Sequence, residues 1–473
     1  METSKQNDIK FIFKNIGAIE YAEVPLNDLT MIVGKNSTSK TYLTYIIWGF
    51  LDFIYEYNSL TTEFIQQIMF KDGVLKQQIN LSNISDELIN HFMFVSKLQY
   101  SQQRVYQVLA IDDKDRLKDF IFDVELNNIT LDYKIKIDSF DVNQIQVIVD
   151  IVDEVLSFSL IKPSDYEITT QELQYISGQL LIYILRHFIK QIFPQPFIIT
   201  SERTGIGVFY KEIIRHRMNE VELIKRSTAK ISSAEAFVNT FARYPAPVSE
   251  NMNTILDLFN TNNLIGKKYF PESVINYLKT NLVHGKYVFN KELNEIFYSQ
   301  DNDNQSVYLP YYLTSSSVKS HLLLDSYIRY YADSGRILII DEPELNLHPD
   351  NLRHMARLLA MLVNAGVKLL FTTHSDYIIK ELNNLIMLES LPDEARDYAI
   401  KQIAKETKTE YQPEMFLAKD KVTRIIAEQN AKTHIVRTKE APINEFGIDA
   451  KIIDDEINRI MAVDEILTNL IDG

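Results

Sequence analysis

The sequence predicts an α/β protein with a parallel core sheet, an antiparallel β lobe, and helical and β insertions. Three observations support this fold class. Residues 29–33 form an apolar strand that leads into GKNSTSKT at 34–41, and residues 337–340 form a second apolar strand that ends in DEPE. Strand-like and helix-like apolar patterns alternate over residues 309–372, which is typical of βαβ units. In such a sheet, ligands bind at the carboxyl ends of the strands.

The antiparallel lobe is expected at the start of the chain, where residues 11–19 and 22–25 alternate between apolar and polar as short strands do. Insertions are expected to follow the first core helix. The expected elements after these strands are the strand 29–33, a helix over 42–55, a mixed helical stretch over 60–116, a hairpin of 120–126 and 130–137 around Asn127 and Asn128, helical spacing over 142–158, a core helix over 173–193 and a strand over 197–200.

A charged helical stretch is expected over 211–241, between these elements and the later segments of the core sheet. Its basic residues between Arg215 and Lys230 form either a solvated helix face or a DNA contact. The remaining expected elements are strands over 286–289, 295–298, 337–340, 367–372 and 385–388, an apolar segment over 309–313, helices over 318–331 and 352–363, and a helical pattern over 450–470.

The composition indicates an ordered cytoplasmic protein. The 473 residues are 46% hydrophobic, which is enough for a large core. The net charge of −15 disfavours diffuse binding to nucleic acid but leaves room for a local basic patch. There is no cysteine, which excludes disulfides and cysteine nucleophiles. The polar N-terminus and the charged breaks in the apolar stretches predict that no segment spans a membrane.

Residues 34–41 predict a loop that binds the phosphates of a nucleoside triphosphate. The loop joins a strand to a helix, so its N–H groups can point at phosphates where the helix begins. Lys40 would reach the outer phosphates and Thr41 would hold Mg²⁺. Ser39 stands where glycine usually permits a positive φ at little cost. An ordinary strand-to-helix turn is the alternative interpretation. The residues predicted to bind phosphate are Gly34, Asn36, Ser37, Thr38, Ser39, Lys40 and Thr41.

The strand 337–340 predicts the other half of the same site. Asp341 suits the coordination shell of the metal, and Glu342 suits the activation of an attacking water. A solvated strand end is the alternative, but the apolar residues before the carboxylates indicate a buried strand. Glu344 is expected to pair with a nearby cation rather than with ATP.

Taken together, these motifs resemble the ABC-type ATPase heads of the group that contains recombination protein F, SMC proteins and OLD ATPases. The matching segments are 34–41, a serine turn before a helix, 341–349 and 372–375, in the family's order along the chain. The resemblance implies ATP and Mg²⁺ as cofactors and His374 as a catalytic histidine near the outer phosphate. It also implies that 346–350 crosses a dimer seam. The turn Ser315, Ser316 and Ser317 would cap ATP bound to the opposite subunit, giving a homodimer or a higher homo-oligomer.

The chain departs from the family pattern at several positions. Ser39 and Ser317 replace glycines, and no glutamine switch loop is evident. Arg203, after the strand 197–200, resembles a strand-end arginine of some of these ATPases, and a surface ion pair is the alternative. No long heptad repeat is visible, which argues against chromosome tethering by an SMC-type coiled coil.

The size of the chain and its moderate insertions resemble the ATPase subunits of PARIS-type anti-phage systems. This resemblance implies a sensor and scaffold that holds a separate Toprim-type effector nuclease and releases it after a trigger such as a phage protein. The alternative is an ATPase of DNA maintenance that acts at gaps or ends, although DNA is not the favoured partner. The expected division is an ATPase head at 1–59 and 306–392, an inserted region at 60–195, a core strand at 196–210, a helical arm at 211–305 and a C-terminal helical region at 393–473.

Overall fold

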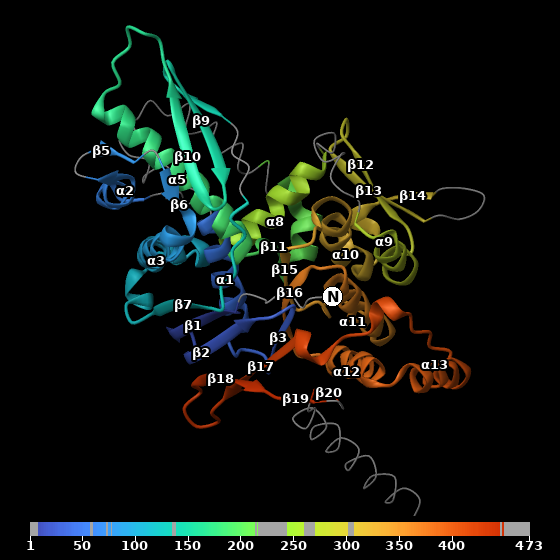
Figure 1. Cartoon of the computed structure of the whole chain (residues 1–473). Helices are drawn as coiled ribbons and strands as arrows, with labels where there is room; N and C mark the ends of the chain where they lie inside the picture. Colours follow the sequence, from blue (N-terminus) through green and yellow to red (C-terminus); the bar gives the residue numbers. More distant parts are fainter. Residues whose placement is uncertain are drawn as a thin grey trace, which may run out of the picture.

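The computed structural model describes residues 8–56, 60–71, 74–76, 78–134, 139–212, 215, 244–259, 270–300, 307–444 and 447–448. A nine-stranded mixed sheet runs through the molecule (Figure 1). In spatial order its strands are β11 (Gln195–Ile199), β15 (Arg336–Asp341), β16 (Lys368–Thr373), β3 (Leu29–Gly34), β17 (Val422–Gln429), β18 (Val436–Ala441), β2 (Ile19–Leu26), β1 (Asp8–Ile16) and β7 (Ile121–Asn127). The α/β fold class with a parallel core and an antiparallel lobe is confirmed.

The strands from β11 to β17 are parallel and form the core half of the sheet. Their apolar runs are almost continuous, because helices cover both faces. Ile337 and Ile339 of β15 face the core that contains α1 (Lys40–Glu56), whereas Leu338 and Ile340 face the core that contains α11 (Pro349–Asn364) and α12 (Asp376–Ser390). The period of two along each strand therefore divides the interior into two hydrophobic cores.

The antiparallel lobe is formed by β2, β1 and β7 at the other edge of the sheet, and β18, which pairs in parallel with β2 and antiparallel with β17, joins it to the core half. β1 pairs with β2 on one side and with β7 on the other. Phe11 of β1 packs against Phe50 of α1, with ring centroids 6.3 Å apart. The lobe is thus fixed to the helix that begins at the phosphate loop.

An inserted region projects from the central sheet (Figure 1). Its four-stranded sheet has the order β6-β10-β9-β8 and lies in the same core as the long helix α5. The elements of this region are α2 (Thr62–Met69), β4 (Phe70–Lys71), β5 (Val74–Leu75), β6 (Gln78–Asn80), α3 (Leu81–Gln99), α4 (Val105–Leu109), β8 (Phe140–Val142), β9 (Ile145–Val152), β10 (Val155–Ile161) and α5 (Thr170–Ile192).

The helical spacing predicted over 142–158 is wrong, because this stretch is the β9–β10 hairpin. Its β-branched residues alternate between buried and exposed along β9. Asp153 and Glu154 form the two-residue turn with φ of +50° and +64°. Positive φ at both turn positions matches the right-handed twist of the flanking strands.

Two further sequence predictions need correction. The hairpin of 120–126 and 130–137 does not form: β7 pairs with β1, and the described residues 128–134 contain no strand. The strand predicted over 385–388 lies inside α12, because Ile378, Leu382 and Leu385 continue a helical apolar spacing.

A smaller layer of helices and a three-stranded sheet covers the second core near α11. The sheet has the order β12-β13-β14. The elements are α8 (Ala246–Asp257), α9 (Glu272–Leu278), β12 (Lys286–Asn290), β13 (Glu295–Gln300), β14 (Val307–Pro310) and α10 (Ser316–Ser326), which continues as a π turn over Tyr327–Tyr331. The strands predicted over 286–289 and 295–298 and the helix predicted over 318–331 are confirmed.

The sequence predicts a helical region over 393–473, but in the described part of it, 393–444 and 447–448, only the first segment is an α-helix. After α13 (Asp393–Thr407), the chain forms β17 and β18 of the central sheet and the short strands β19 (Ile443–Asn444) and β20 (Gly447–Ile448). The helix expected over 450–470 and the basic stretch over 216–230 lie outside the described residues. None of the described helices is long and apolar enough to cross a membrane.

A buried ionic cluster holds α11 against α12. Arg357 Nε lies 2.6 Å from Glu381 Oε1, and Arg353 Nε lies 2.9 Å from Glu381 Oε2. The Glu381 side chain is only 1% exposed. Burial alone would raise the pKa of Glu381, but the charge of Arg357 and the hydrogen bonds from both arginines lower it below its ordinary value. The cluster is therefore ionised at neutral pH.

We predict that Glu381→Gln lowers the free energy of unfolding by about 3–5 kcal/mol, because it leaves buried arginine charge uncompensated. Urea unfolding at neutral pH measures the loss. Because the pKa of folded Glu381 is lowered, the stabilisation is present above the ordinary glutamate pKa and disappears as the pH falls through the lowered value. Arg437→Ala, which breaks the exposed pair with Glu20, is the control and should leave the unfolding curve unchanged. Equal stability of Glu381→Gln and the wild type would contradict the prediction.

Candidate active site

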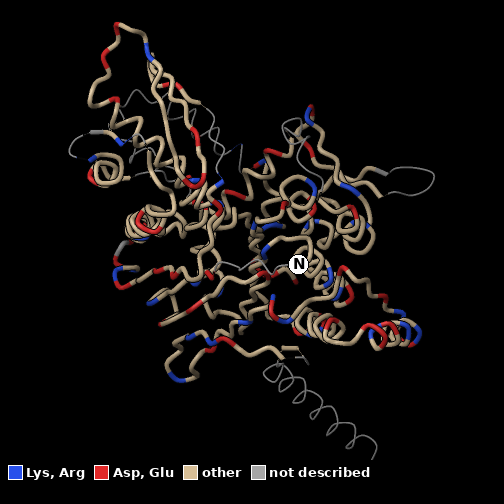
Figure 2. The backbone as a smooth tube through the Cα atoms, viewed as in Figure 1, with Lys and Arg blue, Asp and Glu red and all other residues tan. Residues whose placement is uncertain are grey.

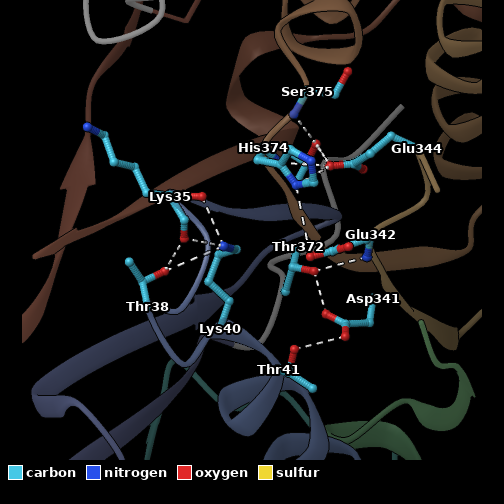
Figure 3. A network of polar contacts seen from close by, with 12 residues as sticks. Lys35, Thr38, Lys40, Thr41, Asp341, Glu342, Glu344, Thr372, His374 and Ser375 are labelled. Carbon is cyan, nitrogen blue, oxygen red and sulfur yellow. Dashed lines mark hydrogen bonds and ion pairs between the residues drawn. The ribbon is translucent and has the colours of Figure 1, made fainter. Parts of the chain in front are cut away.

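The phosphate loop connects β3 to α1 and folds around the ammonium group of Lys40. Lys40 Nζ donates hydrogen bonds to the carbonyl oxygens of Gly34, at 2.9 Å, and Lys35, at 2.8 Å (Figure 3). Burial lowers the pKa of Lys40, while the nearby carboxylates of Glu342 and Asp341 oppose this shift. The backbone carbonyls therefore hold the ammonium group inside the loop, where the oxygens of a bound phosphate would compete with them for its hydrogen bonds.

Two residues at the ends of the loop explain its conformation. A Cβ on Gly34 would lie 2.7 Å from the carbonyl oxygen of Ala427 in β17, so only glycine fits there without a shift. Ser39 has a φ of +61°, a conformation that costs a residue with a side chain about 1–2 kcal/mol. Its hydroxyl accepts a hydrogen bond of 3.2 Å from the Ala18 N–H in the β1–β2 turn. This bond offsets part of the strain and ties the loop to the antiparallel lobe.

Asp341, at the end of β15, is fixed by two threonine hydroxyls. Thr41 Oγ1 donates to Asp341 Oδ2 at 2.9 Å, and Thr372 Oγ1 donates to Asp341 Oδ1 at 2.5 Å (Figure 3). Burial raises the pKa of Asp341, and the bonds from Thr372 and Thr41 oppose this rise. The contact between Thr41 and Asp341 joins the two motifs from opposite ends of the chain.

Glu344, two residues beyond Glu342, holds His374. Its Oε1 atom accepts hydrogen bonds from the His374 N–H at 2.8 Å and from Thr373 Oγ1 at 2.9 Å. His374 Nδ1 lies 3.2 Å from the same oxygen and 3.9 Å from Glu342 Oε1. Burial raises the pKa of Glu344, and the hydrogen bond from the His374 backbone opposes this rise. The side chain that Glu344 contacts is therefore that of the proposed catalytic histidine.

Arg203 is buried beneath the two carboxylates. Its guanidinium donates to the carbonyl oxygens of Asp341 at 3.0 Å and Glu342 at 2.7 Å, and it is 4% exposed. The alternative of a surface ion pair is thus wrong. Glu202 beside it accepts a hydrogen bond of 3.0 Å from the Tyr45 hydroxyl of α1. Arg203 acts on the backbone of the strand end rather than on a side chain, which sequence reasoning could not show.

The predicted site residues fall into two groups in the structure. Loop residues 36–41, Glu342 and His374 surround a cavity of about 360 Å³, whereas Gly34 and Asp341 do not line it and Asp341 is bonded to Thr41. The serine turn does not line this cavity: Ser315 caps α10 and accepts a hydrogen bond of 3.2 Å from the Val318 N–H. The lining residues are Asn36, Ser37, Thr38, Ser39, Lys40, Thr41, Tyr42, Glu342 and His374.

The residues around this cavity fit ATP with Mg²⁺. The N-terminus of α1 and the backbone of the loop offer N–H groups for phosphates. Thr41 and Asp341 offer a hydroxyl and a carboxylate oxygen, which are the ligands that Mg²⁺ takes when substrate phosphates complete its shell. In the described part of the chain, no group of three or more His, Cys, Asp or Glu residues could hold a metal by itself.

Sequence reasoning missed the role of Glu344 and the lining residue Tyr42. Burial distinguishes Glu344 from an ordinary surface carboxylate, since its side chain is 7% exposed and its Oε2 atom has no hydrogen-bond partner among the described residues. The sequence Thr372-Thr373-His374 follows one apolar strand and DEPE follows another, which is a signal that the two segments could be in contact. Only the pairing of β15 with β16 in the structure places the two segments side by side.

We predict that Glu344→Gln lowers kcat by about tenfold to a hundredfold with little change in the KM for ATP, because misplaced catalytic groups lose rate at roughly this scale. The substitution weakens the contact that fixes His374 Nδ1 but leaves Lys40 and Thr41 unchanged. Steady-state phosphate release measures both constants. Glu389→Gln, an exposed change on α12, is the control. A raised KM with normal kcat would show that Glu344 supports nucleotide binding instead.

Comparison with known proteins gives a family for this chain. The family model described as AAA ATPase domain matches residues 9–379. No curated protein matches the sequence. Among solved structures, the chain is similar to the Smc head domain with an extended coiled coil bound to the C-terminal domain of ScpA from Pyrococcus furiosus. That identity is 10%, with 97% of this chain and 100% of that chain covered and a TM-score of 0.32.

Two further solved structures are similar at the same level. The SmcHead bound to the C-winged helix domain of ScpA is 9% identical, with 92% of this chain and 98% of that chain covered and a TM-score of 0.34. The SMC head domain from Thermotoga maritima is 12% identical, with 79% and 91% covered and a TM-score of 0.27. The family match, in contrast, begins in β1 and ends in α12, and so contains the phosphate loop, the end of β15 and His374. The chain belongs to the AAA ATPase domain family and is an ATPase.

Proposed function

We propose that the protein is an ATP-driven switch in which two copies close on ATP and separate after hydrolysis. The observation that carries this proposal is the hydrogen bond between Thr41 and Asp341, with Glu342 and His374 at the edge of the same cavity. The loop, the two groups that could bind a metal and a carboxylate that could activate water therefore lie at one place. Bound Mg²⁺ would neutralise the phosphate oxygens during transfer to water.

Each side chain has a role in this proposal. Lys40 would exchange its bonds to the loop carbonyls for the outer phosphates, and Thr41 and Asp341 would hold Mg²⁺. Glu342 orients and deprotonates the attacking water. His374, held by Glu344, lies beside Glu342 and would contact the outer phosphate. Arg203 fixes the backbone that carries both carboxylates.

The second copy would supply the serine turn. Ser315 and Ser316 are exposed and do not line the cavity of their own chain. They begin α10, whose N-terminal N–H groups and dipole favour a negatively charged ligand. If the turn caps the outer phosphate in the other copy, ATP is shared between two chains, and its hydrolysis removes the contact that holds them together.

For the biological output, we propose a sensor and scaffold in anti-phage defence that holds a separate Toprim-type nuclease and releases it on a phage trigger. The resemblance of the motifs and of the chain size supports this role. The charge distribution favours it over DNA maintenance: the net charge is −15, and acidic and basic residues are interspersed along the described chain (Figure 2). This net negative charge favours protein partners over diffuse contact with phosphate backbones.

We predict that Glu342→Gln with ATP and Mg²⁺ accumulates as a dimer or a higher homo-oligomer, because ATP binds but is not hydrolysed. Lys40→Ala should neither bind ATP nor assemble with it. Mass determination by light scattering, with and without nucleotide, measures the difference. A Glu342→Gln variant that hydrolyses ATP at the normal rate would remove the assignment of Glu342. Assembly that is identical with and without ATP would remove the switch.

We predict that co-expression with the neighbouring gene product yields a complex that survives purification. Addition of a phage extract should release the partner from the wild type but not from Lys40→Ala. Mass determination and electrophoresis of the purified material measure both. A free ATPase that ignores the neighbour and hydrolyses ATP faster with gapped DNA would instead support DNA maintenance.

A further inference from the structure

We infer that Tyr42 forms the nucleoside side of the ATP site, with its ring as the surface on which the base stacks. This inference rests on the proposed function, since it requires a triphosphate on the loop. No motif assigns a role to Tyr42, which follows the metal-binding threonine. The base-binding part of the site is otherwise unassigned.

The order of the strands sets the direction in which a nucleotide lies on the loop. β15 and β16, which carry Glu342 and His374 at their carboxyl ends, lie on one side of β3. β17, β18, β2 and β1 lie on the other side. If Glu342 and His374 meet the outer phosphate, as proposed, a triphosphate on the loop would extend from them toward the antiparallel lobe. The nucleoside would then lie near the β1–β2 turn.

Tyr42 is the aromatic residue at that end of the cavity. Among the 17 residues of α1, only Tyr42 and Glu56 are exposed. The side chain of Tyr42 is 40% exposed and lines the same cavity as Lys40 and Glu342. An exposed ring in the first turn of an otherwise covered helix offers a stacking surface next to the inner phosphates.

The β1–β2 turn holds one edge of the ring in place. A Cβ on Gly17 would lie 2.7 Å from Tyr42 Cε2 and 2.8 Å from Cδ2, so the ring occupies the space that a side chain would fill. Gly17 also has a φ of +57°, which glycine adopts readily. The neighbouring Ala18 N–H is bonded to Ser39 Oγ at 3.2 Å. The β1–β2 turn, the Tyr42 ring and the loop 34–41 therefore contact one another in the absence of a nucleotide. This reduces the entropy that is lost when a nucleotide binds.

Stacking defines the chemical class of the ligand. Every base presents a π face, so an aromatic ring binds a base with little dependence on which base it is, with a contribution of about tenfold to a hundredfold in affinity. We therefore expect the protein to bind ATP and GTP with similar affinity through this contact, and to bind inorganic tripolyphosphate more weakly by the same factor.

The test compares ATP and inorganic tripolyphosphate, each with Mg²⁺, by calorimetry on the full chain. Tyr42→Ala should weaken ATP about tenfold or more and leave tripolyphosphate unchanged, whereas Tyr42→Phe should match the wild type. The fluorescence of 2-aminopurine riboside triphosphate should be quenched on binding to the wild type and not to Tyr42→Ala. Tyr377→Ala, which removes a 52% exposed ring outside the cavity, is the control.

Each other outcome overturns a defined statement. If Tyr42→Ala weakens both ligands equally, Tyr42 only supports the loop and the inference fails. If it weakens neither and quenching persists, the base lies elsewhere. If the wild type and Lys40→Ala bind both ligands equally poorly, the proposed function fails rather than the role of Tyr42.

Discussion

The hydrogen bond from Thr41 to Asp341 is the contact on which the geometry of the site depends. It spans from the first turn of α1 to the end of β15, across β16, which lies between β15 and β3. Thr372 of β16 bonds the other oxygen of the same carboxylate. The carboxylate of Asp341 therefore links the first turn of α1 to the ends of two neighbouring parallel strands, β15 and β16.

The backbone at Glu342 shows how the buried polar groups keep a strained strand end in position. Glu342 has a φ of +50°, a conformation that persists only where the surroundings fix it. Its N–H donates to Thr372 Oγ1 at 3.0 Å, and its carbonyl accepts from Arg203 at 2.7 Å. Because the backbone is held from both sides, the Glu342 side chain can turn out of the strand toward the cavity. Arg203 and Glu344 thus position the site without lining its cavity.

Secondary structure was predictable from the sequence where a motif directly follows a buried apolar strand. It was not predictable where a strand pairs with a segment far along the chain, or where the apolar spacing fits both a helix and a strand. The phosphate loop and the end of β15 were predictable because apolar runs precede their polar residues. The β9–β10 hairpin was missed because its apolar residues also fit a helical spacing, and Asp153 with Glu154 is not a usual turn pair. Glu344 was expected to pair with a nearby cation, but its contact with His374 could not be named, since burial and strand pairing are not visible in the sequence. Whether a segment rich in β-branched residues joins a given sheet depends on the strands with which it pairs, and these can be far away in the sequence.

The C-terminal region is the clearest case of such a distant contact, because it supports the loop directly. β17 pairs with β3 in parallel up to Gly34, opposite Ala427. The carbonyl oxygen of Ala427 is the atom that excludes a side chain at Gly34. A strand that follows all the recognisable motifs therefore explains why the first residue of the first motif must be glycine. The expected boundary at residue 393 separates segments in the sequence but not in the sheet, because β17 pairs with β3, the strand that leads into the loop 34–41.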